Sequence, residues 1–434
     1  MNLSDPLPFL DDLLRTSETP FTVLSHAVDD FFASNNCSLL TEQSSPLSVV
    51  KARVMVYSAP HTVVSPTSFN LDGTTYPLTF RLSIPESATL SSDYEQKSFI
   101  IAKNCCTFEN SWLSITNNSP SKLSLCFSDS AFGNFNTIVG QSLEVIAIYD
   151  PDQQYFDLSC LIVLGYRPLL QGYDSLVTSP PLTLTDFQRF SDLDFLMLSC
   201  CSLPTMDVTN VVEFRSSAGL DHFEHFYKGC TPSLVCLKLD NEKLNNSELF
   251  PVLSAENEQL SEAFFPIPEG GTCLIEVGEV MVKKLSEKGK LNLQLIQDLL
   301  ATGTMSLFYP FGCSKIPIKF SIVLLTTTDS CLSGDLIVDL QSHSIPSDDS
   351  IVTKCRRSII SSFCLSAPSI NEELQEVIEK DYVEIRQSQT KFNSNLLGIC
   401  VNFSILLSKM IGECNVSVDV WKQCFSSVVK IIKE

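Results

Sequence analysis

Residues 49–56 read VVKARVMV and alternate with a period of two. The even-numbered positions are three valines and an alanine, whereas the odd-numbered row includes Lys51 and Arg53. Successive side chains of a β-strand point to opposite faces, so this spacing predicts a half-buried strand. Pro60 follows and is expected to end it.

Short apolar runs continue on the C-terminal side of this strand, with Gly, Pro, Asn and Asp between them. They cover 75–84, 97–104, 111–117, 122–128, 142–150 and 156–166. Many short strands separated by turn residues are typical of a small β-barrel or sandwich, which we expect over 48–166. Before it, residues 1–47 are expected to hold one helix, at 21–34, and a turn-rich connector.

Three prolines mark 167–190 as a linker, and the pattern changes beyond it. Strands are predicted at 194–200, 234–239, 271–277, 304–309 and 319–327, and helices at 253–265 and 291–301. Strands that alternate with helices predict an α/β domain with a largely parallel sheet, here over 191–350.

The last part, 351–434, is predicted to be a helical module. Ser369 and Glu372 have the spacing of a capping box that starts one helix. The segment 394–411 is apolar nearly all round, which predicts a buried helix, and a third helix is expected from about Ser417, with Trp421 on its apolar face.

Composition limits the function. The chain has 434 residues, 29 basic and 50 acidic side chains, and a net charge of −21, which argues against a protein that holds DNA or RNA through its own field. The N-terminus lacks the pattern of a signal peptide, and no apolar run was expected to reach the length of a transmembrane helix. The 17 cysteines form no CxxC, so we expect reduced, buried thiols.

No catalytic, cofactor-binding or metal-binding residue is predicted. The sequence has no GxxxxGK[ST] phosphate loop, and Gly289–Lys290 lacks the earlier glycine. Glu276 and Glu279 end an apolar strand but are not consecutive acids, and Thr326–Thr328 follow another strand without a clear catalytic candidate. We therefore expect ordinary strand ends and no enzymatic activity.

Two weaker patterns have structural alternatives. His222 and His225 could face one metal ion if helical, with Cys230 nearby, but a surface helix turn explains the spacing equally. The cluster KCRR at 354–357 is a weak nuclear-localisation element, and neutralisation of local acids or contact with a partner explains it better.

The C-terminal half resembles the MCM-binding protein family, as a short and divergent member. The likeness is most specific at EELQEVIEKDYVEIRQS (372–388) and continues through 396–411 to SVDVWKQCFSSVVK (417–430). Upstream, the segments 270–285, 291–311, 316–330 and 337–341 follow the order of strands and helices in that family.

The resemblance implies an N-terminal OB-like barrel, a degenerate AAA-like α/β domain without a phosphate loop, and the helical module. It implies a nuclear, non-enzymatic protein that binds minichromosome maintenance helicase subunits in DNA replication. Such a pseudo-subunit would escort, assemble or unload the complex, with indirect chromatin association and links to the cell cycle and sister chromatid cohesion.

Two other functions stay open from the sequence. The barrel could bind single-stranded nucleic acid through Lys51, Arg53 and Tyr57, since such sites combine aromatic and basic side chains. The chain could also be an unrelated interaction scaffold. Neither reading requires a cofactor or a membrane.

Overall fold

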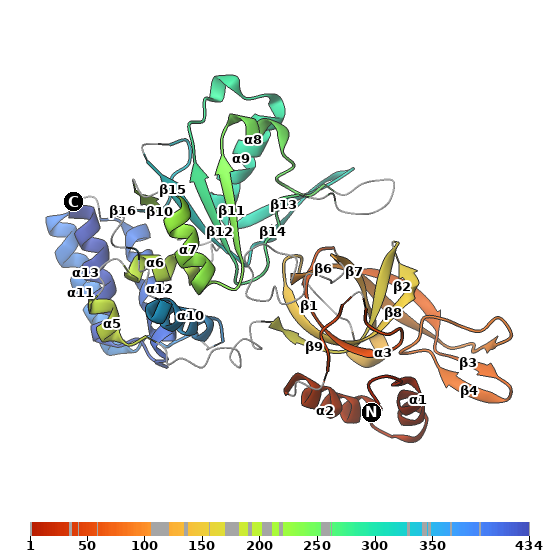
Figure 1. Ribbon diagram of the computed structural model, residues 1–434. Helices are drawn as coiled ribbons and strands as arrows, with labels where there is room; N and C mark the ends of the chain where they lie inside the picture. The colour runs from red at the N-terminus through yellow and green to blue at the C-terminus, as the bar shows by residue number, and fades with distance from the viewer. Residues whose placement is uncertain are drawn as a thin grey trace. The chain divides into compact units, whose positions relative to one another are not determined.

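The structure is a computed structural model. It describes residues 2–33, 37–41, 43–58, 60–105, 121–133, 138–155, 157–169, 182–189, 193–201, 211–216, 220–252, 261, 263–327, 330–340, 345, 349–364, 367–389 and 392–433. The predicted strand at 111–117 and most of the predicted helix at 253–265 lie outside these residues. The chain divides into two compact units, one mainly of β-strands and one of mixed helices and strands (Figure 1).

The first unit contains the β-rich part. Its elements are α1 (Leu7–Thr16), α2 (Pro20–Ala33), β1 (Val49–Val56), β2 (His61–Pro66), β3 (Ser68–Leu71), β4 (Thr74–Pro77), β5 (Thr89–Leu90), β6 (Tyr94–Asn104), β7 (Lys122–Ser128), α3 (Asp129–Phe132), β8 (Ser142–Tyr155) and β9 (Leu158–Pro168). The predicted strand 75–84 is mostly wrong, because only its first residues belong to β4. Helix α1 was not predicted.

The strands of the main sheet pair in the order β1-β8-β9-β7-β6-β2, and β1 also pairs with β6. The strands β1, β8, β9, β7 and β6 therefore pair in a closed ring, and β2 pairs with β6 outside this ring. All of these pairs are antiparallel except β7 and β9, which run parallel.

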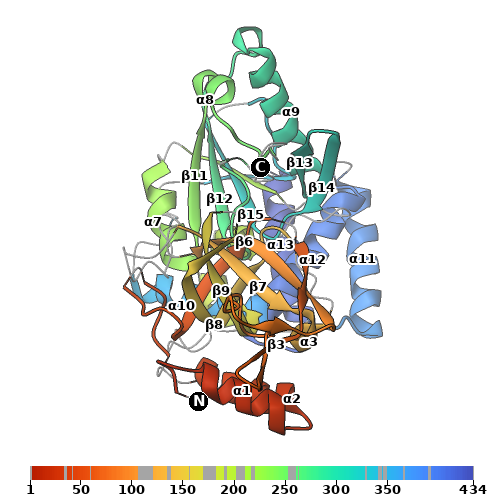
Figure 2. The ribbon, with the colours of Figure 1, turned by 90° about the vertical axis from the view of Figure 1, so that its right-hand side faces the viewer.

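Strand β1 is buried on both faces, so the prediction of a half-buried strand is wrong in that respect. Val50, Val54 and the other even-numbered residues join one apolar cluster with β6–β9. Val49, on the odd-numbered row, joins a second cluster that includes Leu24 and Val28 of α2. The helices α1 and α2 lie side by side against this outer face, which the alternation alone could not reveal (Figure 2).

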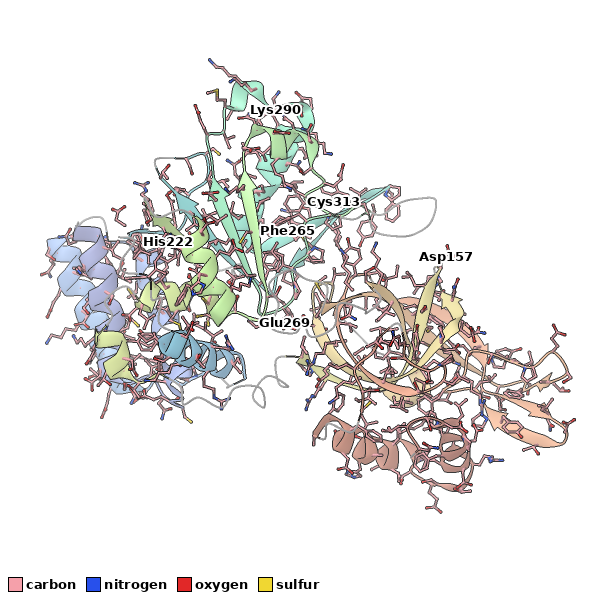
Figure 3. All side chains as sticks on the ribbon, viewed as in Figure 1. Asp157, His222, Phe265, Glu269, Lys290 and Cys313 are labelled. Atoms are coloured by element: carbon pink, nitrogen blue, oxygen red, sulfur yellow. The ribbon has the colours of Figure 1, made fainter. Side chains whose placement is uncertain are left out.

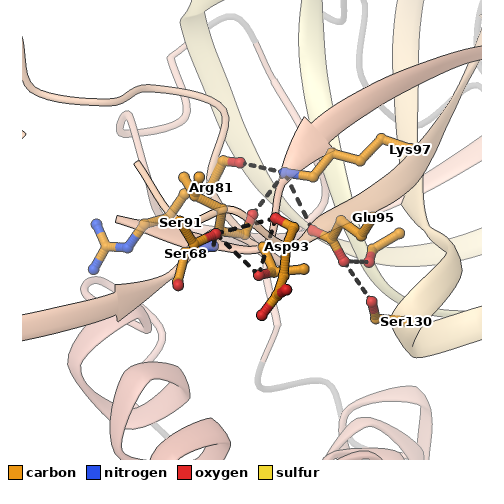
Figure 4. A network of polar contacts seen from close by, with 10 residues as sticks. Ser68, Arg81, Ser91, Asp93, Glu95, Lys97 and Ser130 are labelled. Carbon is orange, nitrogen blue, oxygen red and sulfur yellow. Dashed lines mark hydrogen bonds and ion pairs between the residues drawn. The ribbon is translucent and has the colours of Figure 1, made fainter. Parts of the chain in front are cut away.

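A buried charged pair holds the β3–β5 excursion against β6. The Lys97 ammonium donates to the carbonyl oxygens of Leu78 at 2.6 Å and Arg81 at 2.7 Å, and lies 3.8 Å from Glu95 (Figure 4). Glu95 in turn accepts hydrogen bonds from the hydroxyls of Ser128 and Ser130. Burial lowers the pKa of Lys97, which its acidic neighbours only partly oppose.

The second unit contains the mixed part. Its elements are α5 (Leu184–Arg189), α6 (Leu193–Cys201), β10 (Val212–Arg215), α7 (Leu220–Cys230), β11 (Leu234–Leu239), α8 (Asn241–Asn246), β12 (Thr272–Val277), the 3-10 helix Val282–Lys284, α9 (Glu287–Thr302), β13 (Thr304–Tyr309), β14 (Gly312–Pro317), β15 (Ser321–Thr326), β16 (Leu336–Asp339), α10 (Asp349–Cys364), α11 (Glu372–Ser388), α12 (Ser394–Ile411) and α13 (Val418–Lys433).

Five strands form an entirely parallel sheet in the order β11-β12-β15-β10-β16. The predicted parallel sheet is thus confirmed, although β10 and β16 were not recognised as strands. Residues 304–309 form β13, but this strand pairs with β14 in a separate antiparallel hairpin rather than with the parallel sheet.

The predicted strand at 194–200 is wrong, because these residues belong to helix α6. Every residue of α6 is buried. A short segment that is apolar on all sides has no periodicity to separate a buried helix from a buried strand.

The C-terminal helices share one apolar cluster with the sheet, and α10 joins the three that were predicted. Helix α12 is long and apolar enough to cross a membrane by length and composition, so the expectation that no segment would reach this length is wrong. In the structure α12 is a core helix: after Asn395 all of its residues are buried or half-buried, and it packs against α6, α10 and α13.

The capping prediction for α11 is displaced by two residues. Its N-cap is Asn371, whose side chain accepts from the Leu374 amide at 2.9 Å. Ser369 instead forms a bridge with Asn415 in the loop before α13. The predicted burial of the cysteines is confirmed for most of those that the structure describes.

Candidate protein-interaction surface

The sequence from β10 through α7, residues 212–230, contains no GxxxxGK[ST] phosphate loop. Gly289 and Lys290 lie instead in the first turn of α9 (Figure 3). Ser286 caps that helix through the Gly289 amide, and Lys290 lowers the pKa of Glu287 by an ion pair at 2.7 Å. These residues start a helix rather than bind phosphate.

Two of the strand-end candidates, Glu276 and Thr326, have structural partners. Glu276 is half-exposed and pairs with Lys238 on the neighbouring strand at 3.3 Å. Thr326 donates its hydroxyl proton to Glu213 at 2.9 Å. Thr327 is exposed and Thr328 lies outside the described residues. Contacts between neighbouring strands therefore hold Glu276 and Thr326.

Glu213 is a buried residue that the sequence reading missed. Its carboxylate accepts from Thr326 on β15 and, at 3.0 Å, from the Gly334 amide before β16, and it lies 3.3 Å from Arg215. One carboxylate thus ties β10 to both of its neighbours in the parallel sheet. The only available signal was a single acid inside the apolar run VVEF.

The histidine pair does not assemble a metal site. His222 and His225 are exposed on α7, whereas Cys230 is fully buried (Figure 3). No group of three metal-binding side chains occurs among the described residues. In the basic cluster, Arg356 donates to the Gly229 carbonyl at 2.7 Å and Lys354 lies 3.9 Å from Asp186, so these two side chains serve local contacts.

The nucleic-acid candidates on the β-rich unit are covered or paired. Tyr57 is 1% exposed, so its ring cannot stack on a base. Lys51 is buried and its pKa is lowered mainly by that burial. Arg53 pairs with Glu144 at 3.1 Å, and Arg167 pairs with the same carboxylate at 2.6 Å. These residues lack the exposed aromatic and basic face that single-strand binding needs.

A buried carboxylate joins the two segments that carry the strongest family likeness. Asp381 on α11 is 7% exposed and accepts from the indole nitrogen of Trp421 at 2.7 Å. The Lys422 ammonium donates to both Asp381 oxygens, at 2.6 and 2.7 Å. The segments 372–388 and 417–430 are therefore in direct contact, through a junction between α11 and α13.

This junction fixes which face of α11 points outward. Leu374 and Ile385 are buried in the core cluster, with Ile378 packed beside them. The opposite face is charged: Glu372, Glu373, Glu376, Glu379 and Glu384 are exposed, together with Lys380 and Arg386. Of the two faces that could meet a partner, the apolar one is used inside the protein and the acidic one remains accessible.

The hairpin β13–β14 presents the second accessible feature. Figure 1 shows it as a ribbon that extends away from the five-stranded sheet. Phe311 at its tip is 88% exposed, the highest value among the large hydrophobic side chains that the structure describes. The exposed glutamates of α11 and the apolar tip of the hairpin are thus the two candidate surfaces for contact with another protein.

Comparison with known proteins places this chain. Residues 198–427 match the family described as mini-chromosome maintenance replisome factor. The UPF0616 protein C1687.04 of Schizosaccharomyces pombe is 23% identical over 64% of this chain and 60% of its own length. Two proteins named mini-chromosome maintenance complex-binding protein are also similar. That of Arabidopsis thaliana is 23% identical over 45% of this chain and 34% of its own length. That of Gallus gallus is 20% identical over 48% of this chain and 35% of its own length.

This chain therefore matches between about a third and three fifths of the length of these curated relatives. The family match extends over more than half of the chain and includes the parallel sheet, the hairpin, helices α10 to α12 and the first part of α13. The chain belongs to the mini-chromosome maintenance replisome factor family.

Proposed function

We propose that this chain is a non-enzymatic binding partner of mini-chromosome maintenance helicase subunits. It would act in DNA replication as a pseudo-subunit that escorts, assembles or unloads the helicase complex. The observation that carries the proposal is the position of the family match, residues 198–427, on the unit with the parallel sheet and the exposed hairpin. Relatives that share this similarity are named as binders of the mini-chromosome maintenance complex.

The parallel sheet is consistent with the degenerate AAA-like domain that the family resemblance implies. Numbered along the chain, its five strands lie in the order 2-3-4-1-5. This differs from the 3-2-1-4-5-6 and 2-1-3-4-5 orders of common doubly wound folds. The sequence from β10 through α7, residues 212–230, lacks the phosphate loop GxxxxGK[ST]. A subunit-like shape without nucleotide chemistry is what a pseudo-subunit requires.

The closed ring of pairings supports an OB-like barrel in the first unit. Numbered along the chain, β1, β6, β7, β8 and β9 pair in the order 1-2-3-5-4-1, with the third and fifth parallel. OB-folds are five-stranded Greek-key barrels of this kind. Because Tyr57 is buried and Arg53 is paired, we propose no strong direct nucleic-acid binding and an indirect association with chromatin in the nucleus.

The acidic field of the chain is consistent with such a partner. A net charge of −21 repels nucleic acid and favours contact with basic surfaces, which DNA-binding helicase subunits carry. The exposed glutamates of α11 would contribute to the rate of association more than to its strength.

Gel filtration of the purified full chain with purified helicase subunits tests the proposal. We expect the chain and the subunits to co-elute, also after nuclease treatment. In a separate titration with the chain alone, the fluorescence of a fluorescent ATP analogue should not change. Separate elution of a folded chain and folded subunits would refute the partner function. Saturable binding of the ATP analogue would refute the non-enzymatic pseudo-subunit.

A further inference from the structure

The tip of the β13–β14 hairpin is apolar on both faces. The register pairs Tyr309 with Gly312 and Phe308 with Cys313, so the turn itself is Pro310 and Phe311. Pro310 and Cys313 are exposed, while Phe308 and Tyr309 are half-buried (Figure 3). The tip is thus a cluster of adjoining apolar side chains rather than one isolated exposed residue, and such clusters mark interaction sites.

The base of the hairpin is anchored, which holds the tip in one arrangement. Met305 and Leu307 are buried, and α9 packs against β13. Near the tip, the Phe308 amide donates to the Pro251 carbonyl at 3.3 Å. The rings of Tyr309 and Phe311 stack with their centroids 5.7 Å apart. Pro310 also restricts the backbone of the turn. An aromatic side chain held in this way loses little conformational freedom when it binds.

The charge of the hairpin differs from that of the chain. Residues 304–317 contain no acidic side chain and one basic side chain, Lys315, although the chain as a whole has a net charge of −21. Lys315 is exposed and lies on the same strand as Cys313. A complementary site would therefore be an apolar pocket with a carboxylate at its rim.

We infer that the hairpin tip is the anchor through which this chain engages a helicase subunit, with the Phe311 ring inserted into an apolar, acid-rimmed pocket of that subunit. The inference rests on the proposed function, because the hairpin lies within the residues that match the family. Aromatic side chains that enter a desolvated pocket dominate the affinity of many protein interfaces. The 88% exposure of Phe311 leaves nearly all of its surface to be buried there.

Binding of the full chain to purified helicase subunits, measured by biolayer interferometry, tests the inference. We expect Phe311→Ala to weaken binding by ~10-fold or more, a change of about 1.4 kcal/mol. Phe311→Trp should keep the affinity within about threefold, since it retains an aromatic anchor. Lys315→Glu should weaken binding with a dependence on salt concentration.

Tyr94→Ala provides the matched control. Tyr94 is an aromatic residue of β6 that is 64% exposed and lies outside the family match, so its removal should leave the affinity unchanged. Equal affinities of the wild-type chain and Phe311→Ala would overturn the inference and leave the proposed function intact. Absence of binding by the wild-type chain would overturn both. Loss of self-association in Phe311→Ala, with helicase binding unchanged, would assign the tip to a second copy of the chain and also overturn the inference.

Discussion

Replacement of Asp381 by alanine should weaken the C-terminal helices by about 2–3 kcal/mol. The change leaves the indole N–H of the buried Trp421 without its acceptor, and an unsatisfied buried donor costs about 1–3 kcal/mol. The ion pair to Lys422 adds about 1 kcal/mol or less, because the lysine side chain is 53% exposed and can return to solvent. Asp381→Asn should cost about half as much, since the amide oxygen can still accept from Trp421.

Urea unfolding followed by tryptophan fluorescence measures this effect. The chain has two tryptophans, so all variants carry Trp112→Phe and the signal comes from Trp421 alone. With a slope of about 1–3 kcal/mol per molar urea, the midpoint for Asp381→Ala should fall by about 0.7–3 M. Lys422→Ala is the control and should change the free energy of unfolding by about 1 kcal/mol at most. An Asp381→Ala midpoint equal to that of the control would refute the proposed role of the junction.

Three further predictions concern thiols, pH and the sheet. Brief alkylation of the folded chain, read by mass spectrometry, should label Cys313 and Cys414, which are exposed, well before Cys126, since burial raises the pKa of that thiol to about 12; early labelling of Cys126 would contradict its burial. Burial lowers the pKa of Lys97 in the folded chain. Between that lowered pKa and the unfolded value of about 10.4, the unfolded chain binds more protons than the folded chain, so the free energy of unfolding should rise with pH. In unfolding followed by circular dichroism, Lys97→Met should lose this rise; the same pH dependence in the variant and the wild-type chain would count against the prediction. Glu213→Ala should speed amide exchange in β15 and β16, whereas Glu213→Gln retains acceptors and should do so less; unchanged exchange in both variants would remove Glu213 as the link between the strands.

The strands and helices that the sequence predicted correctly have a clear period or clear ends. Residues 122–128 are β7, and the helix expected at 21–34 is α2 at Pro20–Ala33. The strand predicted at 194–200 is wrong because this short segment is buried on every side, so its sequence pattern does not separate a strand from a helix. The burial of the second face of β1 depends on α1 and α2. Helix α1 was not predicted, and the packing of α2 on this face is a tertiary contact that the alternation in β1 does not reveal.

The candidate surface was less accessible to sequence reasoning than the fold. The sequence named the 372–388 helix but could not choose between its faces, because that choice depends on Asp381 meeting Trp421 across α13. Phe311 stands in an apolar run that also reads as a buried strand, and only the pairing of β13 with β14 places it at an exposed turn. Long-range pairing and exposure are tertiary properties that local periodicity does not encode.

The most direct test of the central claim is the equilibrium binding of the full chain to purified mini-chromosome maintenance subunits, with and without nuclease treatment and ATP. Partner function predicts a saturable complex with a Kd of ~1 µM or tighter, independent of both. No complex at about 10 µM of folded chain and folded subunits, or a complex that disappears when nucleic acid is removed, would contradict it.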